Sequence, residues 1–151
     1  MQARMKHPVY VLPDAMKALT SLSKSVQQSG LPKAIGDLVA LRASQINGCS
    51  VCVGMHSADL RKQGESDERL FAVAAWRDTP YFTDAERAAL ALTEAATRVA
   101  DTGDPVSDEI WSEATKHYSE SELAGLVMGI AMINLWNRLN ATTRQVPSGT
   151  W

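Results

Sequence analysis

The sequence lacks the features that mark several specialised classes of protein. Its 151 residues include only two cysteines, too few for a small secreted fold held together by disulfides. A formal net charge of -2 does not indicate binding to nucleic acid or to a membrane surface. The longest apolar run, residues 123–135, is shorter than the roughly 20 residues that cross a bilayer. No apolar stretch of signal-peptide length stands near the N-terminus. We therefore expect a cytoplasmic protein, with neither nucleic acid nor a membrane as its partner.

What is present is the composition of one globular domain. Hydrophobic residues make up 45% of the chain and charged residues 21%, which supplies enough apolar surface to offset the entropy of ordering the chain. We expect a single domain over residues 1–151, with its packed core at about 14–144. A chain of this size can bury a core without disulfides. The two cysteines are therefore not needed for stability, and their placement requires another explanation.

Capping residues and apolar periodicity predict helices throughout the chain. The expected helices cover about 14–28, 32–46 and 49–64, and four more begin after Ser66, Thr83, Ser107 and Ser119. A Glu stands three positions after Thr83 and after Ser119, which is the capping-box pattern. No run of alternating β-branched residues predicts a strand. The predicted fold class is therefore all-α, a compact multi-helix bundle.

The apolar residues give further expectations about burial. Trp76, Tyr81 and Phe82 are expected in the core. The apolar run 123–135 suits a helix that is buried on all sides, either within the domain or between subunits. Pro147 and Gly149 predict a loose tail after Arg144.

Cys49, Cys52 and His56 form a Cys-x-x-Cys-x-x-x-His pattern at the start of the third expected helix. Spacings of three and four residues place all three side chains on one helix face. Unpaired N–H groups and the helix dipole at a helix N-terminus favour thiolate over thiol. Two neighbouring sulfurs can close a disulfide after one is oxidised, and a nearby imidazole can take a thiol proton. The pattern therefore predicts a redox-active dithiol.

Two other interpretations of the same residues remain open. Buried cysteines often serve only as small apolar residues in a core. Alternatively, Cys49, Cys52 and His56 supply three possible zinc ligands. No fourth ligand stands nearby in the sequence, since His7 and His117 are distant and no second cysteine pair exists. We therefore expect no metal at this pattern.

The segment DLVALRASQINGCSVCVGMH, residues 37–56, resembles the active-site region of the alkylhydroperoxidase D-like branch of the carboxymuconolactone decarboxylase family. The resemblance continues through Ala74-Ala75-Trp76 and the segment TDAER at 83–87, and ends with INLWNR at 133–138. It implies an all-helical fold and a homo-oligomer, either a homotrimer or a homohexamer. It also implies thiol-dependent reduction of hydroperoxides without a cofactor, which is an antioxidant, peroxiredoxin-type activity.

The family motif carries a Glu twelve residues before the first cysteine, and here Asp37 occupies that position. At 1.5 Å per residue, Asp37 lies about 15 Å before the Asn47-Gly48 turn and His56 roughly 12 Å along the next helix. Asp37 is therefore expected to approach His56, and His56 to approach Cys52, as a proton relay. Since Asp is one methylene shorter than Glu, either a water bridges the gap or the relay is weaker. The alternative for Asp37 is an ordinary surface charge.

Two arguments compete over the roles of the sulfurs. Proximity to the helix end favours Cys49 as the sulfur with the lower pKa, whereas proximity to His56 favours Cys52. The resemblance also supports Cys52, so we expect Cys52 to attack the peroxide and Cys49 to close the disulfide. Val51 occupies a position where some family members carry another His, which predicts slower or narrower peroxide chemistry. The resemblance implies an external dithiol reductant, either a lipoyl-bearing or a thioredoxin-like protein.

Two further functions compete with a peroxidase. A lactone decarboxylase-type proton-transfer enzyme would use His56 and a carboxylate and would need neither sulfur. A non-catalytic redox sensor would form the same disulfide, but its effect would fall on a partner or on assembly. No basic helix or DNA-reading motif supports the sensor.

Overall fold

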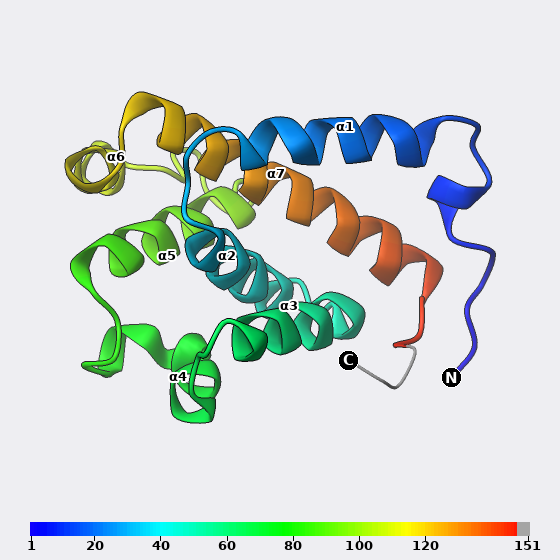
Figure 1. The fold of residues 1–151 in the computed structure, drawn as a ribbon, viewed down its shortest axis with the longest axis horizontal. Helices are drawn as coiled ribbons and strands as arrows, with labels where there is room; N and C mark the ends of the chain where they lie inside the picture. Colours follow the sequence, from blue (N-terminus) through cyan, green and yellow to red (C-terminus); the bar gives the residue numbers. More distant parts are fainter. Residues whose placement is uncertain (148–151) are drawn as a thin grey trace.

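The computed structural model describes residues 1–147 and contains helices without any strand in that range. The predicted all-α fold is therefore confirmed for the described residues. Residues 1–147 form seven α-helices and two short 3-10 helices, and Figure 1 shows how the α-helices are arranged. The elements are η1 (Pro8–Tyr10), α1 (Ala15–Gln27), α2 (Lys33–Ile46), α3 (Ser50–Lys62), α4 (Asp67–Ala72), η2 (Val73–Asp78), α5 (Asp84–Thr97), α6 (Asp108–His117) and α7 (Glu120–Thr143).

Local capping chemistry sets the helix starts. Thr83 and Ser119 each accept a backbone N–H from the Glu three residues later, and each Glu side chain accepts the backbone N–H of its capping residue in return. Both predicted capping boxes are thus confirmed at the starts of α5 and α7. Gly48 has a φ of 66°, a left-handed conformation that glycine adopts without strain, so α2 can reverse directly into α3.

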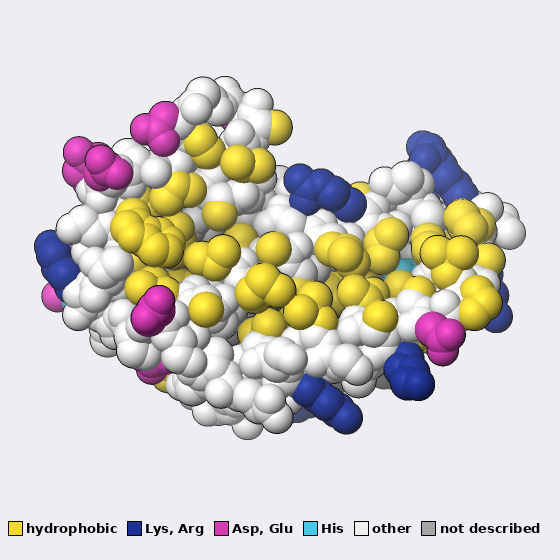
Figure 2. All heavy atoms as spheres, turned by 90° about the horizontal axis from the view of Figure 1, so that it is seen from above, with side chains coloured by type: hydrophobic (Ala, Val, Ile, Leu, Met, Phe, Trp, Pro, Cys, Tyr) yellow, Lys and Arg dark blue, Asp and Glu magenta, His cyan; other side chains and the backbone are white. Residues whose placement is uncertain are grey.

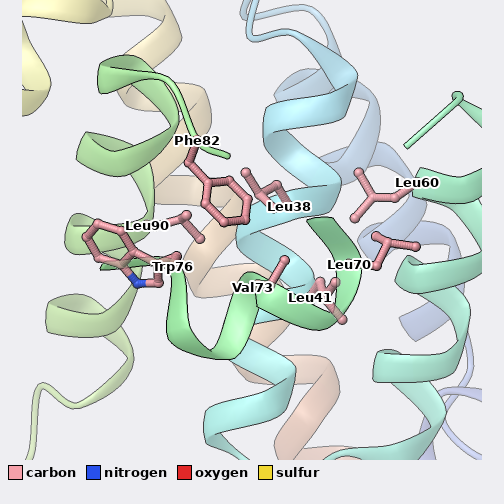
Figure 3. Packing of buried hydrophobic residues seen from close by; sticks show 8 residues of the cluster. All are labelled: Leu38, Leu41, Leu60, Leu70, Val73, Trp76, Phe82 and Leu90. Atoms are coloured by element: carbon pink, nitrogen blue, oxygen red, sulfur yellow. The ribbon is translucent and has the colours of Figure 1, made fainter. Parts of the chain in front are cut away.

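The core surrounds α2, which Figure 3 shows between side chains from α3, α4, η2 and α5. Leu38 and Leu41 on α2 pack with Leu60, Leu70, Val73, Trp76, Phe82 and Leu90. A second cluster joins α2 to α5, α6 and α7. The apolar packing therefore fixes α2, and with it the turn into α3, near the centre of the molecule.

The aromatic expectations are only partly correct. Trp76 and Phe82 are buried, but Tyr81 is 47% exposed. Tyr81 and Phe82 are neighbours in the turn before α5, and only Phe82 faces the core. A short turn that buries one of two adjacent side chains directs the other into solvent.

The apolar run in α7 is not buried on all sides of the described chain. Leu126 and Ile130 are buried, whereas Val127, Met128 and Leu135 are 40%, 41% and 38% exposed. The helix packs mainly on α1, α2 and α5, with smaller contacts to α3 and α6, and its exposed apolar side chains lie on the side that these helices leave open. Figure 2 views the molecule from the side on which α1 lies, where apolar side chains gather into a band. Burial of α7 between subunits stays a prediction. None of the helices in residues 1–147 has both the length and the hydropathy to span a membrane.

The N-terminal segment lies along the end of α7. The backbone N–H of Arg4 donates to the Thr143 carbonyl at 2.9 Å, and its guanidinium donates to the Thr142 carbonyl at 2.9 Å. Gln145 donates to the Met5 carbonyl at 3.0 Å. These three bonds hold residues 4–10, which we call the N-terminal strap, against the helix. The tail after Arg144, expected to be loose, is hydrogen-bonded at Gln145, whose backbone N–H also donates to the Asn140 carbonyl at 2.9 Å. The part of the tail from residue 148 lies outside the described residues.

Candidate active site

The two cysteines lie where α2 turns into α3. The backbone N–H of Cys49 donates to the Ser44 carbonyl at 3.0 Å, and Cys49 then occupies the N-cap of α3. The Cys49 and Cys52 Sγ atoms are 2.9 Å apart, and the residues are only 3% and 2% exposed. A disulfide bond is about 2.05 Å long, so this is a reduced dithiol. Its sulfurs are close enough that a small movement closes the bond.

The local hydrogen bonds divide the charge of the pair unequally. The hydrogen bond with the Cys52 thiol lowers the pKa of Cys49 to about 6, aided by the Cys52 backbone N–H, although burial opposes this shift. The same hydrogen bond, followed by burial and the charge on Cys49, raises the pKa of Cys52. The pair at rest therefore carries its negative charge on Cys49 and its proton on Cys52. This distribution follows the helix-end argument rather than the argument from His56.

A side chain that the sequence did not single out contacts both sulfurs. The Asn140 amide on α7 donates to Cys52 Sγ at 3.2 Å and to Cys49 Sγ at 3.7 Å. Asn134, Asn137 and Asn140 are all buried and recur every three residues on one face of α7. Asn47, at the end of α2, donates to the side-chain oxygens of Asn134 and Asn137, both at 2.9 Å. This buried row of amides ties the turn that carries the dithiol to α7.

His7 is the second missed residue. Its Nε2 atom lies 3.1 Å from the Asn140 side-chain oxygen, and its Nδ1 atom accepts the Val9 backbone N–H at 3.3 Å. His7 is distant from the cysteine pattern in the sequence, and the structure brings it to Asn140, which lies 133 residues further along the chain. A row of asparagines in an apolar helix was the available signal for Asn140. No local pattern pointed to His7.

Asp37 and His56 lie in contact across the α2–α3 turn. The Asp37 Oδ1 atom is 3.2 Å from His56 Nδ1, and its Oδ2 atom accepts hydrogen bonds from Lys33 and, at 2.7 Å, from Gln63. Burial raises the pKa of Asp37, but the hydrogen bonds from His56, Lys33 and Gln63 outweigh it and lower the pKa to about 2. Asp37 is therefore an ionised carboxylate that is fixed in place by hydrogen bonds, and little of its side chain is exposed.

The second half of the expected relay has no direct contact. No hydrogen bond joins His56 to either sulfur in the part of the chain that the structure describes. The imidazole is paired with Asp37 on α2, whereas Cys52 is paired with Cys49 and Asn140. The structure thus groups the predicted residues into two pairs, Cys49 with Cys52 and Asp37 with His56. Cys52 and His56 are one turn apart on α3.

One cluster within residues 1–147 has the residue types of a metal site. Ligand atoms of Asp37, His56 and Asp59 all lie within 4.8 Å of one another. However, Lys33 and Gln63 already bind the free oxygen of Asp37. The cysteines belong to no such cluster in that range. The arrangement therefore suits proton handling at Asp37 and His56, and thiol chemistry at the sulfurs.

Comparison with known proteins identifies the family of the chain. The model of the carboxymuconolactone decarboxylase family matches residues 13–95. The chain is 35% identical over 130 residues to the uncharacterised protein YdfG of Bacillus subtilis. This alignment covers 86% of this chain and 87% of that protein. It is 34% identical, with a TM-score of 0.90, to an Agrobacterium tumefaciens protein of unknown function that is described as a candidate antioxidant defence protein AhpD. That match covers 99% of this chain and 100% of the other.

A more distant likeness shows the fold alone. The debrominase Bmp8 matches with a TM-score of 0.75 and 23% identity, over 91% of this chain and 73% of that protein.

Proposed function

Since the chain belongs to the alkylhydroperoxidase D-like branch of the carboxymuconolactone decarboxylase family, we propose that it is an antioxidant oxidoreductase that reduces alkyl hydroperoxides or hydrogen peroxide. The observation that carries the proposal is the reduced Cys49–Cys52 pair, with sulfurs 2.9 Å apart at the start of α3. A lowered pKa supplies thiolate near neutral pH, and the second sulfur is in place to complete a disulfide.

The proposed reaction has two steps at the sulfurs. In the first, a thiolate attacks the terminal peroxide oxygen, the O–O bond breaks, and a sulfenic acid and an alkoxide form. The alkoxide takes up a proton and leaves as an alcohol. In the second, the other sulfur attacks the sulfenic sulfur, water leaves, and the Cys49–Cys52 bond forms. The two thiols together lose two hydrogen atoms, and the hydroperoxide becomes an alcohol and water.

We assign the attack to Cys52 and the second step to Cys49. At rest the proton lies on Cys52, so it must pass to Cys49 across the 2.9 Å hydrogen bond before or during the attack. The thiolate of the sulfur with the higher pKa is the stronger nucleophile. A minor form with its charge on Cys52 can therefore carry the reaction, and Cys49 acts as the base that generates it.

Asp37 and His56 are assigned to proton supply for the leaving alkoxide. The contact between His56 Nδ1 and Asp37 Oδ1 leaves the imidazole Nε2 as the atom that exchanges a proton. A water between this nitrogen and the sulfurs would complete the path. Asp37 stays ionised throughout, because its hydrogen bonds hold its pKa at about 2.

The remaining parts of the cycle rest on the family. We propose that a lipoyl-bearing or thioredoxin-like protein reduces the disulfide in the cytoplasm, and that the protein works as a homotrimer or homohexamer. The exposed apolar side of α7 suits contact with a second subunit.

The experiment combines thiol counting with turnover. Reduced protein should lose both free thiols on addition of an alkyl hydroperoxide, and a dithiol donor should sustain repeated consumption of peroxide. The double variant Cys49→Ser/Cys52→Ser is the control and should consume none. In Cys49→Ser alone, which lacks the proposed base as well as the second sulfur, Cys52 should react more slowly and a sulfenic acid should be trapped on it. Survival of both thiols in excess peroxide would contradict the proposal.

The same experiment separates the alternative functions. A decarboxylase-type enzyme is favoured only by the Asp37–His56 contact, and its activity on a lactone acid would survive the double serine change. A redox sensor would form the disulfide without sustained turnover, and its oligomeric state would change between the reduced and the oxidised protein.

A further inference from the structure

The N-terminal strap brings a histidine close to the dithiol, on the side where α7 contacts the sulfurs. His7 lies beside α7, with its ring 5.7 Å from the Trp136 ring and 5.9 Å from the Tyr10 ring, measured between centroids. Within residues 1–147, its ring nitrogens contact the Val9 backbone N–H and the Asn140 side chain. Asn140 in turn reaches both sulfurs. A continuous chain of hydrogen bonds thus connects the strap to Cys52.

The direction of each bond in this chain is fixed from its outer end. Val9 donates a backbone N–H to His7 Nδ1, so in the neutral ring Nδ1 is the acceptor and Nε2 carries the hydrogen. Nε2 therefore donates to Asn140, which must offer its oxygen. With the oxygen engaged by His7, the amide nitrogen of Asn140 faces the sulfurs, where its N–H groups donate.

The opposite orientation of the amide would disfavour the thiolate. An Asn140 side chain turned by half a rotation would direct its oxygen, the negative end of its dipole, at a negative sulfur. It would also direct an N–H group at the N–H of His7. Hydrogen bonds to a charged group are worth more than neutral ones, and the site is buried, so the two orientations differ substantially in free energy.

We propose that His7 is a positioning residue for the dithiol, which holds the Asn140 amide in the orientation that donates hydrogen bonds to the reacting sulfurs. The inference deepens the proposed peroxidase function and rests on it for the identity of the oxidant. The inferred effect on thiolate formation needs no peroxide.

A matched pair of substitutions separates donation from packing. His7→Phe keeps a ring against Trp136 and Tyr10 but removes the N–H donor. His7→Gln loses the ring and keeps an N–H donor near the position of Nε2. Gln also does not titrate, so it removes any contribution from protonation of the imidazole. Asn140→Leu removes both bonds to sulfur at similar volume, and His117→Phe, on α6, is a control.

The readout is the pH midpoint of thiolate formation, measured by thiolate absorbance and by the pH dependence of iodoacetamide alkylation. Loss of one hydrogen bond to a charged group corresponds to about a tenfold change in the ionisation constant. We expect His7→Phe to raise the midpoint by up to about one pH unit and Asn140→Leu by at least as much. His7→Gln and His117→Phe should stay at the wild-type midpoint.

Two results would overturn the inference. One is a wild-type midpoint in a folded His7→Phe protein. The other is an equal shift in His7→Gln and His7→Phe, which would mean that the ring matters and the donor does not. If the midpoints shift as expected while the wild-type protein consumes no hydroperoxide, the inference stands and the proposed function fails.

Discussion

Replacement of Glu94 by Gln should destabilise the protein strongly, because Glu94 anchors the central helix α2. Its Oε1 atom accepts Arg42 Nε from α2 at 2.7 Å and the Trp76 indole N–H at 2.9 Å, and its Oε2 atom accepts Arg77 at 2.6 Å. The side chains of Glu94 and Arg42 are only 10% and 12% exposed. Gln can keep one acceptor, but its NH2 group would face the Arg77 donor, and the buried Arg42 would lose its counter-ion.

Two estimates of the cost agree. Removing one partner of a buried ion pair typically costs about 3–5 kcal/mol. Independently, burial raises the pKa of Glu94, but hydrogen bonds from Arg77, Trp76 and Arg42 lower it from 4.5 to about 2. At 1.36 kcal/mol per pKa unit, this shift corresponds to about 3 kcal/mol of stability at neutral pH. A domain is stabilised by only about 5–15 kcal/mol in total, so the loss should be easy to measure.

Urea unfolding followed by circular dichroism measures this loss, with Glu113→Gln as the control. Glu113 pairs with Lys116 on the exposed surface of α6, so its replacement should leave the unfolding midpoint unchanged. The folded pKa of Glu94 is depressed, so its contribution is complete above pH 4.5 and declines as the pH falls towards 2. Glu94→Gln should lack this part of the acid dependence. A loss no larger than that of Glu113→Gln would refute the reasoning.

The site gives two more predictions and the packing a third. Cys52→Ala should raise the pKa of Cys49 above about 6, whereas Cys52→Ser, which keeps a hydroxyl donor, should raise it less; alkylation rates against pH measure both. The peroxidase activity of the wild type should fall as the pH is lowered, with a midpoint near pH 6, because Cys49 gains a proton there while Asp37 stays ionised down to about pH 2. A peroxidase pH profile with no loss between about pH 7 and 5 would contradict this. Gly125→Ala should destabilise the α1–α7 contact by about 1–3 kcal/mol in urea unfolding, because its new methyl group would overlap the Ser29 side chain.

Features with local causes were predictable from the sequence. The helix starts at Thr83 and Ser119 depend on a residue three positions away, and the structure has both capping boxes. Asp37 and His56 face each other across one tight turn, so counting the rise per residue was sufficient to bring them together.

Features set by tertiary packing were not predictable in the same way. The contact between His7 and Asn140 spans 133 residues and depends on where the strap crosses α7. The division of charge between Cys49 and Cys52 depends on which sulfur accepts the hydrogen bonds, and spacing alone left that open. Tyr81 is exposed because its neighbour Phe82 occupies the core, a choice that composition does not make.

The central claim is that hydroperoxide oxidises Cys49 and Cys52 to a disulfide with each other. Two mass measurements on fully reduced protein treated with one equivalent of an alkyl hydroperoxide test this directly. The first is the mass of the intact protein, and the second is peptide mapping after digestion. We expect the loss of two hydrogen atoms per chain, one equivalent of peroxide consumed, and a Cys49–Cys52 cross-link in the mapped peptide. An unchanged mass, or cross-links only between chains, would contradict it.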